Sequence, residues 1–167
     1  MLLEQINIES PIFNLKETSR VWVYQSSKLL SEKEVIVLQS QLNAFVKDWA
    51  AHSQQLSAVG DVLFNRFIIL AVDESQAGAS GCSIDKSVHF LQTIENQYDI
   101  TLFDRLTFSY LDENEAKTVS SSDFKRLYTE GPISDETLVF DNTINTVSAL
   151  KSGWLKPLKE SWHKRFV

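Results

Sequence analysis

Residues 64–72 read Phe-Asn-Arg-Phe-Ile-Ile-Leu-Ala-Val, and this stretch decides the fold of the chain. Apart from Asn65 and Arg66 it is apolar throughout, with no alternation of polar and apolar side chains. A strand with one face in water would alternate, whereas a strand buried on both faces does not. The run therefore predicts a central β-strand that is covered on both sides.

The segments on either side of this run carry different patterns. Residues 75–83 read Ser-Gln-Ala-Gly-Ala-Ser-Gly-Cys-Ser, a loop of small side chains. From about Ile84 to Tyr98 apolar side chains recur at steps of three and four, which predicts an amphipathic helix. Before the run, residues 50–61 are polar, with Gly60 close to their end, and we expect a loop there.

Further upstream, the sequence predicts a strand and a second helix. Residues 21–25, Val-Trp-Val-Tyr-Gln, are β-branched and aromatic, as is typical of a short strand. Ser31 followed by Glu34 forms the pattern of a capping box at a helix start. Behind it, apolar side chains recur at helical spacing over about five turns: Val35, Leu38, Leu42, Phe45 and Trp49.

The rest of the chain predicts shorter elements. We expect a hairpin of 106–111 with 116–119, a short helix after Ser121, and a strand at 137–140, with a helical stretch near residues 147–150. Residues 1–19 show no period and form an irregular lead-in. The predicted fold is α/β or α+β: a single domain spanning 1–167, with helices packed on a mixed sheet of about five strands.

The distribution of charge limits the classes of partner that the protein can bind. The 167 residues carry sixteen basic and twenty-two acidic side chains, a net charge of −6. Residues 151–167 alone carry +4, so the remaining body carries −10. An acidic body repels phosphate backbones, which argues against a nucleic-acid partner. The tail is also rich in large apolar groups, so we expect it to pack on the body; contact with a polyanion is the alternative.

The composition also points to a compartment. No stretch approaches the ~20 apolar residues of a membrane span, and the start of the chain has no secretory pattern. The single cysteine, Cys82, has no second thiol with which to form an internal disulfide. We therefore expect a soluble, cytoplasmic protein without a membrane partner. No cofactor motif or close-spaced ligand cluster is present, so neither a cofactor nor a metal site is expected.

The loop at residues 78–84 is the leading candidate for a binding site. A helix start exposes backbone N–H groups and the positive end of the helix dipole, which together attract anions. The candidate ligand-binding residues are Ser80, Gly81 and Ser83, with Arg66 as a buried cation. Two alternatives stay open. The glycines can simply permit a tight connection, and a carboxylate of the protein can neutralise Arg66.

Cys82, His89 and His163 are the candidate catalytic residues. A thiol near a helix start has a lowered pKa, but as a nucleophile it also needs a base. His89 lies seven residues on, about 10 Å along a helix, so a base such as His163 must be brought in by the fold. His89 shares a helix face with Asp85, and a solvated face explains that pair equally well.

A nucleotide-binding P-loop is excluded by counting. Lys86-Ser87 resembles the end of the motif, which requires glycine at positions 80 and 85. Ser80 and Asp85 occupy those positions, and a carboxylate there would repel phosphate. We therefore predict a binding or interaction domain for a small anionic ligand or a protein partner. A small enzyme built on Cys82 or His89 with His163 is the alternative.

Three segments resemble a small family of uncharacterised bacterial proteins. They are residues 21–25, the block from Phe64 to Phe90, and residues 160–166, Glu-Ser-Trp-His-Lys-Arg-Phe. The likeness runs from about Ser19 to the C-terminus. Some members carry the label "ABC transporter ATPase". That label does not fit this chain, which lacks both the P-loop and a Leu-Ser-Gly-Gly-Gln signature. The resemblance implies no activity and no residue roles.

Overall fold

The computed structural model describes residue 3 and residues 6–167. Within them the chain forms four α-helices, nine strands and three 3₁₀ helices. The strands make three sheets of three, two and four strands, and every pairing is antiparallel. The fold is therefore α+β, and the expectation of one mixed sheet of about five strands was wrong. Strand periodicity shows that a segment is extended, but it does not show which strands pair.

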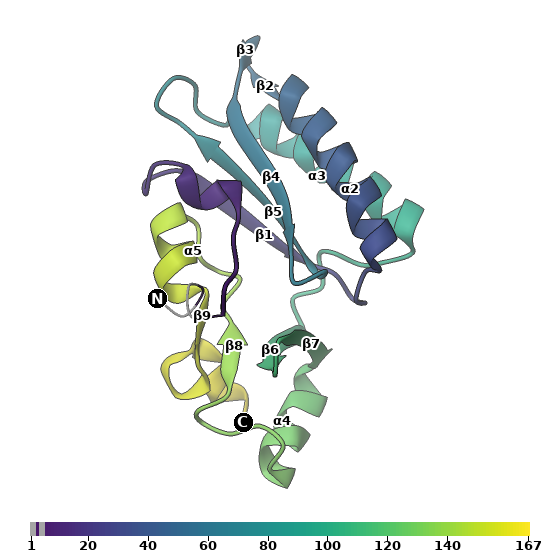
Figure 1. The fold of residues 1–167 in the computed structure, drawn as a ribbon, viewed down its shortest axis with the longest axis vertical. Coiled ribbons are helices and arrows are strands. Elements are labelled where there is room, and N and C mark those ends of the chain that lie inside the picture. Colours follow the sequence, from purple (N-terminus) through teal and green to yellow (C-terminus); the bar gives the residue numbers. More distant parts are fainter. Residues whose placement is uncertain (1–2, 4–5) are drawn as a thin grey trace.

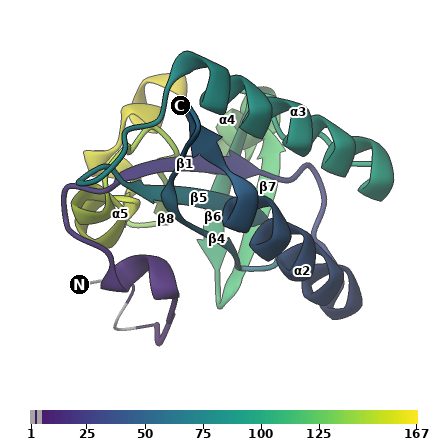
Figure 2. The same cartoon turned by 90° about the horizontal axis from the view of Figure 1, so that it is seen from above.

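The long apolar run forms the middle of the first sheet, as predicted. Its strand order is β1 (Arg20–Gln25), β5 (Phe67–Asp73) and β4 (Ser57–Leu63). The first six residues of β5 are all buried. Helices α2 (Glu32–Asp48) and α3 (Gly81–Tyr98) lie side by side on one face of this sheet (Figures 1 and 2).

Both long helices begin at capping boxes. At α2 the Glu34 N–H donates to Ser31 Oγ at 3.1 Å, and the Ser31 N–H donates to Glu34 Oε1 at 3.0 Å. This is the box that the sequence predicts. At α3 the same exchange links Ser80 and Ser83. The second box starts α3 at Gly81, about three residues before the predicted start, because Ser83 fills the place that glutamate usually takes.

The predicted loop at 50–61 is instead mostly strand, which corrects the sequence prediction. It contains β2 (Ala50–Ala51), β3 (Gln54–Gln55) and most of β4. Gly60 is a packing residue, because a Cβ at this position would lie 3.3 Å from the Leu42 Cβ of α2. The glycine therefore lets α2 approach the sheet closely, and it does not break the strand.

The turn that joins β4 to β5 has an unusual composition. Phe64 and Asn65 both adopt positive φ, at 56° and 52°, and the Arg66 N–H donates to Leu63 O at 3.2 Å. The connection has three residues, 64–66, and a tight turn with two positive-φ residues suits the twist of antiparallel strands, but it is usually made by asparagine and glycine. Because Phe64 is apolar, the turn looked like part of the strand, and the sequence pattern placed the start of the strand at residue 64.

The four-stranded sheet, called the second sheet from here on, lies beyond the three-stranded first sheet along the long axis of the molecule (Figure 1). It contains β6 (Thr107–Asp112), β7 (Glu115–Ser120), β8 (Leu138–Phe140) and β9 (Leu155–Pro157), in the order β7-β6-β8-β9. The β6–β7 hairpin matches the sequence pattern. Helix α4 (Ser121–Glu130) follows β7 and packs against the hairpin and the C-terminal residues.

The remaining short elements are three 3₁₀ helices and one α-helix. They are η1 (Pro11–Asn14), α5 (Val147–Gly153), η2 (Leu158–Glu160) and η3 (Trp162–Phe166). Trp154 is fully buried on the second face of the first sheet, among the rings of Phe64, Phe67 and Phe140.

Four of the five basic residues in the C-terminal segment pair with acids of the body. Lys151 contacts Glu17, Lys156 contacts Asp141, Lys159 contacts Glu136, and Lys164 contacts Asp135, at 2.5–2.9 Å. Within the described residues, no helix combines the length and apolar character that a bilayer crossing requires.

Candidate functional site

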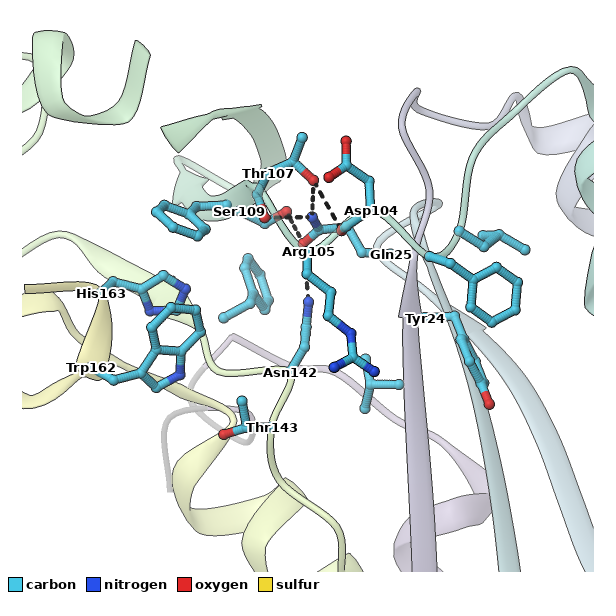
Figure 3. A pocket seen from close by; sticks show the side chains of 15 residues that line it. Tyr24, Gln25, Asp104, Arg105, Thr107, Ser109, Asn142, Thr143, Trp162 and His163 are labelled. Atoms are coloured by element: carbon cyan, nitrogen blue, oxygen red, sulfur yellow. Dashed lines mark hydrogen bonds between the residues drawn. The ribbon is translucent and has the colours of Figure 1, made fainter. Parts of the chain in front are cut away.

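A cavity of about 380 Å³ lies where the two sheets meet (Figure 3). Five segments that are distant in sequence form its wall. They are the end of β1, the loop at 102–105, the start of β6, the turn after β8, and η3. Only the folded chain brings these five segments together, so the cavity is a product of the whole fold. Polar and aromatic side chains share the lining.

Gln25 is the polar hub of this wall. Its Nε2 donates to the carbonyl and the hydroxyl oxygen of Thr107, at 3.2 and 3.0 Å. Its Oε1 accepts from Ser109 Oγ at 2.5 Å and from Asn142 Nδ2 at 3.0 Å. Asn142 in turn accepts from Trp154 Nε1 at 2.9 Å. One buried amide thus ties β1, β6 and the turn after β8 together.

Asp141, next to this turn, fixes the indole that closes one side of the cavity. Its carboxylate accepts from Trp162 Nε1 at 2.9 Å and from Lys156 Nζ at 2.9 Å, and also from Thr143. Burial alone would raise the pKa of Asp141, but these hydrogen bonds lower it to about 2. The carboxylate therefore stays ionised and holds Trp162 in place.

His163 is a buried wall residue with an unusual titration. Its ring stacks on Trp162 at a centroid distance of 3.8 Å, and its Nδ1 lies 2.6 Å from Ser161 Oγ. Burial lowers the pKa of His163 to about 4, against a partial opposing effect of Asp141. The imidazole is consequently neutral at pH 7. No hydrogen bond between described residues uses its Nε2.

Arg105 is the one cation among the residues that line the cavity. Figure 3 shows its side chain reaching from the Thr107 side of the cavity toward Asn142. Among the described residues, no carboxylate lies within ion-pair distance of its guanidinium. The neighbouring Asp104 accepts instead from the Leu106 N–H at 2.8 Å, and its carboxylate points away from the guanidinium. The cavity thus contains a positive charge available to a ligand.

The predicted anion loop lies elsewhere and already holds a carboxylate of the protein. Glu74 Oε2 accepts from the Ala79 N–H at 2.8 Å. The backbone N–H groups of Ser80 and Ser83 are used in the capping box of α3. Gly81 follows as the first residue of the helix. An anion site at residues 78–84 remains a prediction, and none of these residues lines the cavity.

Among the described residues, Arg66 forms no ion pair with a carboxylate and donates to backbone carbonyls instead. Its Nε donates to Ala116 O at 2.8 Å, and its Nη1 donates to Ser26 O at 2.9 Å. Burial lowers its pKa, and the charge of Glu115 opposes this effect. Because Ala116 belongs to β7, Arg66 links the first sheet to the second through backbone carbonyls.

The structure does not bring the candidate catalytic residues together. Cys82 and His89 are exposed on α3, over the first sheet, and the pair of His89 with Asp85 lies on the solvated face. His163 lies in η3, packed against Phe108 in the other part of the molecule. Within the described residues, no group of three histidine, cysteine or acidic side chains could hold a metal ion.

Sequence reasoning missed Gln25, Arg105 and Asn142. The hydrogen bond from Asn142 to Gln25 joins residues 117 positions apart, and no local sequence pattern predicts such a contact. Comparison of the chain with protein-family models, with curated proteins and with solved structures yields no match. Functional inference therefore depends on the geometry of the site, and the family resemblance remains an expectation.

Proposed function

We propose that the protein is a binding protein whose cavity between the two sheets takes a small ligand with a carboxylate and a flat apolar part. The observation that carries this proposal is the guanidinium of Arg105, which enters the cavity without a described carboxylate partner. Arginine recognises carboxylates through paired, charge-assisted hydrogen bonds. Arg105 is an exposed residue of the cavity lining, and a positive charge at this place on an otherwise acidic protein favours an anionic ligand locally.

The rest of the lining supports the apolar half of the ligand. Phe108, Phe140 and Trp162 line the cavity with ring surface, which suits a planar group. Asn142 and Thr143 add polar atoms at one end. Small-molecule sites commonly combine apolar walls with a few placed polar groups, in volumes of about 300–1,000 Å³. A cavity of about 380 Å³ therefore suits a compact ligand.

This proposal keeps the binding role that the sequence indicates and moves the site. None of the residues of the loop at 78–84 lines the cavity between the two sheets, whereas Arg105 does. An enzyme built on His163 has less support, because a general base works best with a pKa near the operating pH. The pKa of His163, near 4, is too low for that role at neutral pH.

The experiment is a titration with benzoate, a flat carboxylate, followed by amide NMR shifts of the protein. Benzamide, which has the same shape without the charge, is the matched ligand. We expect benzoate to shift residues around the cavity and to bind at least about tenfold more tightly than benzamide, because a hydrogen bond to a charged group contributes ~1.5–3 kcal/mol.

The matched variants are Arg105→Gln and Arg126→Gln. Arg126 lies on α4 in exposed pairs with Asp123 and Glu130, away from the cavity. Arg105→Gln should abolish the preference for benzoate, and Arg126→Gln should leave it unchanged. Equal binding of benzoate and benzamide to the unmodified protein, or shifts confined to other surfaces, would contradict the proposal.

A further inference from the structure

The cavity borders an open stretch of sheet edge. In the order β1-β5-β4, strand β1 has β5 on one side only. The Ser26 N–H, just past β1, donates to Arg66 O on the β5 side, and the Val21 N–H donates to Asn145 O on the opposite side. Hydrogen-bonding direction alternates along an antiparallel strand. The backbone groups of Val23 therefore face away from β5, toward the cavity that Val23 lines.

The two ends of this edge are already occupied. At one end Arg20 pairs with Thr146 in an antiparallel bridge, so the position opposite Val21 belongs to Asn145. At the other end the Gln25 side chain crosses to Thr107 and Ser109. Among the described residues, no hydrogen bond outside the ladder uses the N–H or C=O of Val23. Between these two occupied ends, Val23 is the one described residue of the β1 edge whose backbone groups are open.

Resting on the proposed function, we infer that the ligand is the carboxyl terminus of an extended peptide, which pairs with β1 at Val23. A peptide running in the direction of Asn145–Thr146 has to end opposite Val23, because Asn145 occupies the next hydrogen-bonding position along this edge, which is the one opposite Val21. Its last N–H then donates to the Val23 C=O. Its terminal carboxylate accepts from the Val23 N–H and from the guanidinium of Arg105, which lines the same cavity and extends toward Asn142 in Figure 3.

The surroundings of the cavity favour a peptide over a free small carboxylate. The loop at 102–105 lines the cavity, and this loop and the residue that follows it carry two exposed apolar side chains, Phe103 at 40% and Leu106 at 70% exposure. Phe103 packs edge-on against Tyr24, next to Val23 in β1. Side chains of the residues before the peptide terminus would cover this apolar rim. Strand addition of this kind combines backbone pairing with side-chain contacts.

The test compares three peptides with the benzoate probe on the intact chain. The first is acetyl-Ala-Val-Phe with a free carboxylate, the second is its C-terminal amide, and the third is N-methylated at the last peptide nitrogen. We expect the free acid to bind more tightly than benzoate and to slow hydrogen exchange of the Val23 amide. Amidation and N-methylation should each weaken binding at least about fivefold, since each removes one hydrogen-bonding group.

The outcomes separate the two proposals. If benzoate binds in an Arg105-dependent manner and the peptide binds no better, the peptide inference is wrong and the proposed function stands. If the amide binds as well as the free acid, recognition of the terminal carboxylate by Arg105 is wrong. If the N-methyl peptide binds as well as the free acid, the pairing at Val23 is wrong. If neither benzoate nor the peptide binds, both proposals fail. The variants Arg105→Gln and Arg126→Gln serve again as the test and the control.

Discussion

Burial of His163 makes the stability of the protein depend on pH. An unfolded chain protonates histidine near pH 6.5, whereas burial lowers the pKa of folded His163 to about 4. Between these values the unfolded state binds more protons than the folded state, so stability falls as the pH falls. The stabilisation is complete above about pH 6.5, and lowering the pH to 4 should remove up to ~3 kcal/mol.

The measurement is urea unfolding at pH 7 and at pH 4.5. The variant His163→Asn should show a smaller decrease in unfolding free energy over this interval than the unmodified protein. His89→Asn is the control, because His89 is exposed on α3. An unchanged pH dependence in His163→Asn would show that other groups cause the loss.

Single residues of the site differ in how readily the sequence reveals them. The capping pair Ser31 and Glu34 was predictable, because a capping box needs only a spacing of three residues. Arg105 and Gln25 were not predictable, since their roles depend on contacts made after folding. The bonds of Gln25 reach 82 and 117 residues along the chain.

At the scale of elements, the contact between α2 and β4 depends on Gly60. A Cβ there would lie 3.3 Å from both Leu42 Cβ and Leu70 Cδ2. Gly60→Val adds two further carbons to this crowded site and should destabilise the protein by about 1–3 kcal/mol. Thermal and urea unfolding measure the change.

Gly81→Val is the matched control for that substitution. A Cβ at Gly81 meets nothing within 4 Å, so we expect a change within about 0.5 kcal/mol. Equal losses in the two variants would mean that close packing does not explain Gly60.

The same contact explains an error of element assignment. Polar residues and a glycine indicated a loop at 50–61, but β4 needs the glycine for packing and pairs fully with β5. The central strand was predictable, because burial on both faces leaves a continuous apolar pattern. An edge strand that packs beneath a helix, such as β4, has a mixed sequence of polar and apolar residues. Whether such a segment forms a strand depends on the strand with which it pairs.

For the whole molecule, residues 151–167 are part of the core. They supply β9 and three buried apolar side chains: Trp154, Leu155 and Leu158. A chain that ends at Leu150 should lose cooperative unfolding, because the loss of one large buried aromatic alone costs about 3–5 kcal/mol. Circular dichroism during heating checks this expectation.

A control for the truncation is Arg165→Ala, which changes an exposed side chain of the same segment. It should melt close to the unmodified protein. If the truncated chain melted at the same temperature too, the segment would contribute nothing to the folded state. The large apolar residues made this packing predictable, whereas the division into separate sheets was not, since strand pairing leaves no trace in local periodicity.

The stacking of Trp162 on His163 has an optical consequence. The indole ring lies 3.8 Å from the imidazole, and a protonated imidazole quenches the fluorescence of an adjacent indole. The same indole lines the cavity, so a bound ligand changes the surroundings of the indole and therefore its emission. The part of the protein's fluorescence that comes from Trp162, one of four tryptophans, therefore reports two events without any attached dye. It dims when acid charges the ring beneath it, and it changes when a ligand enters.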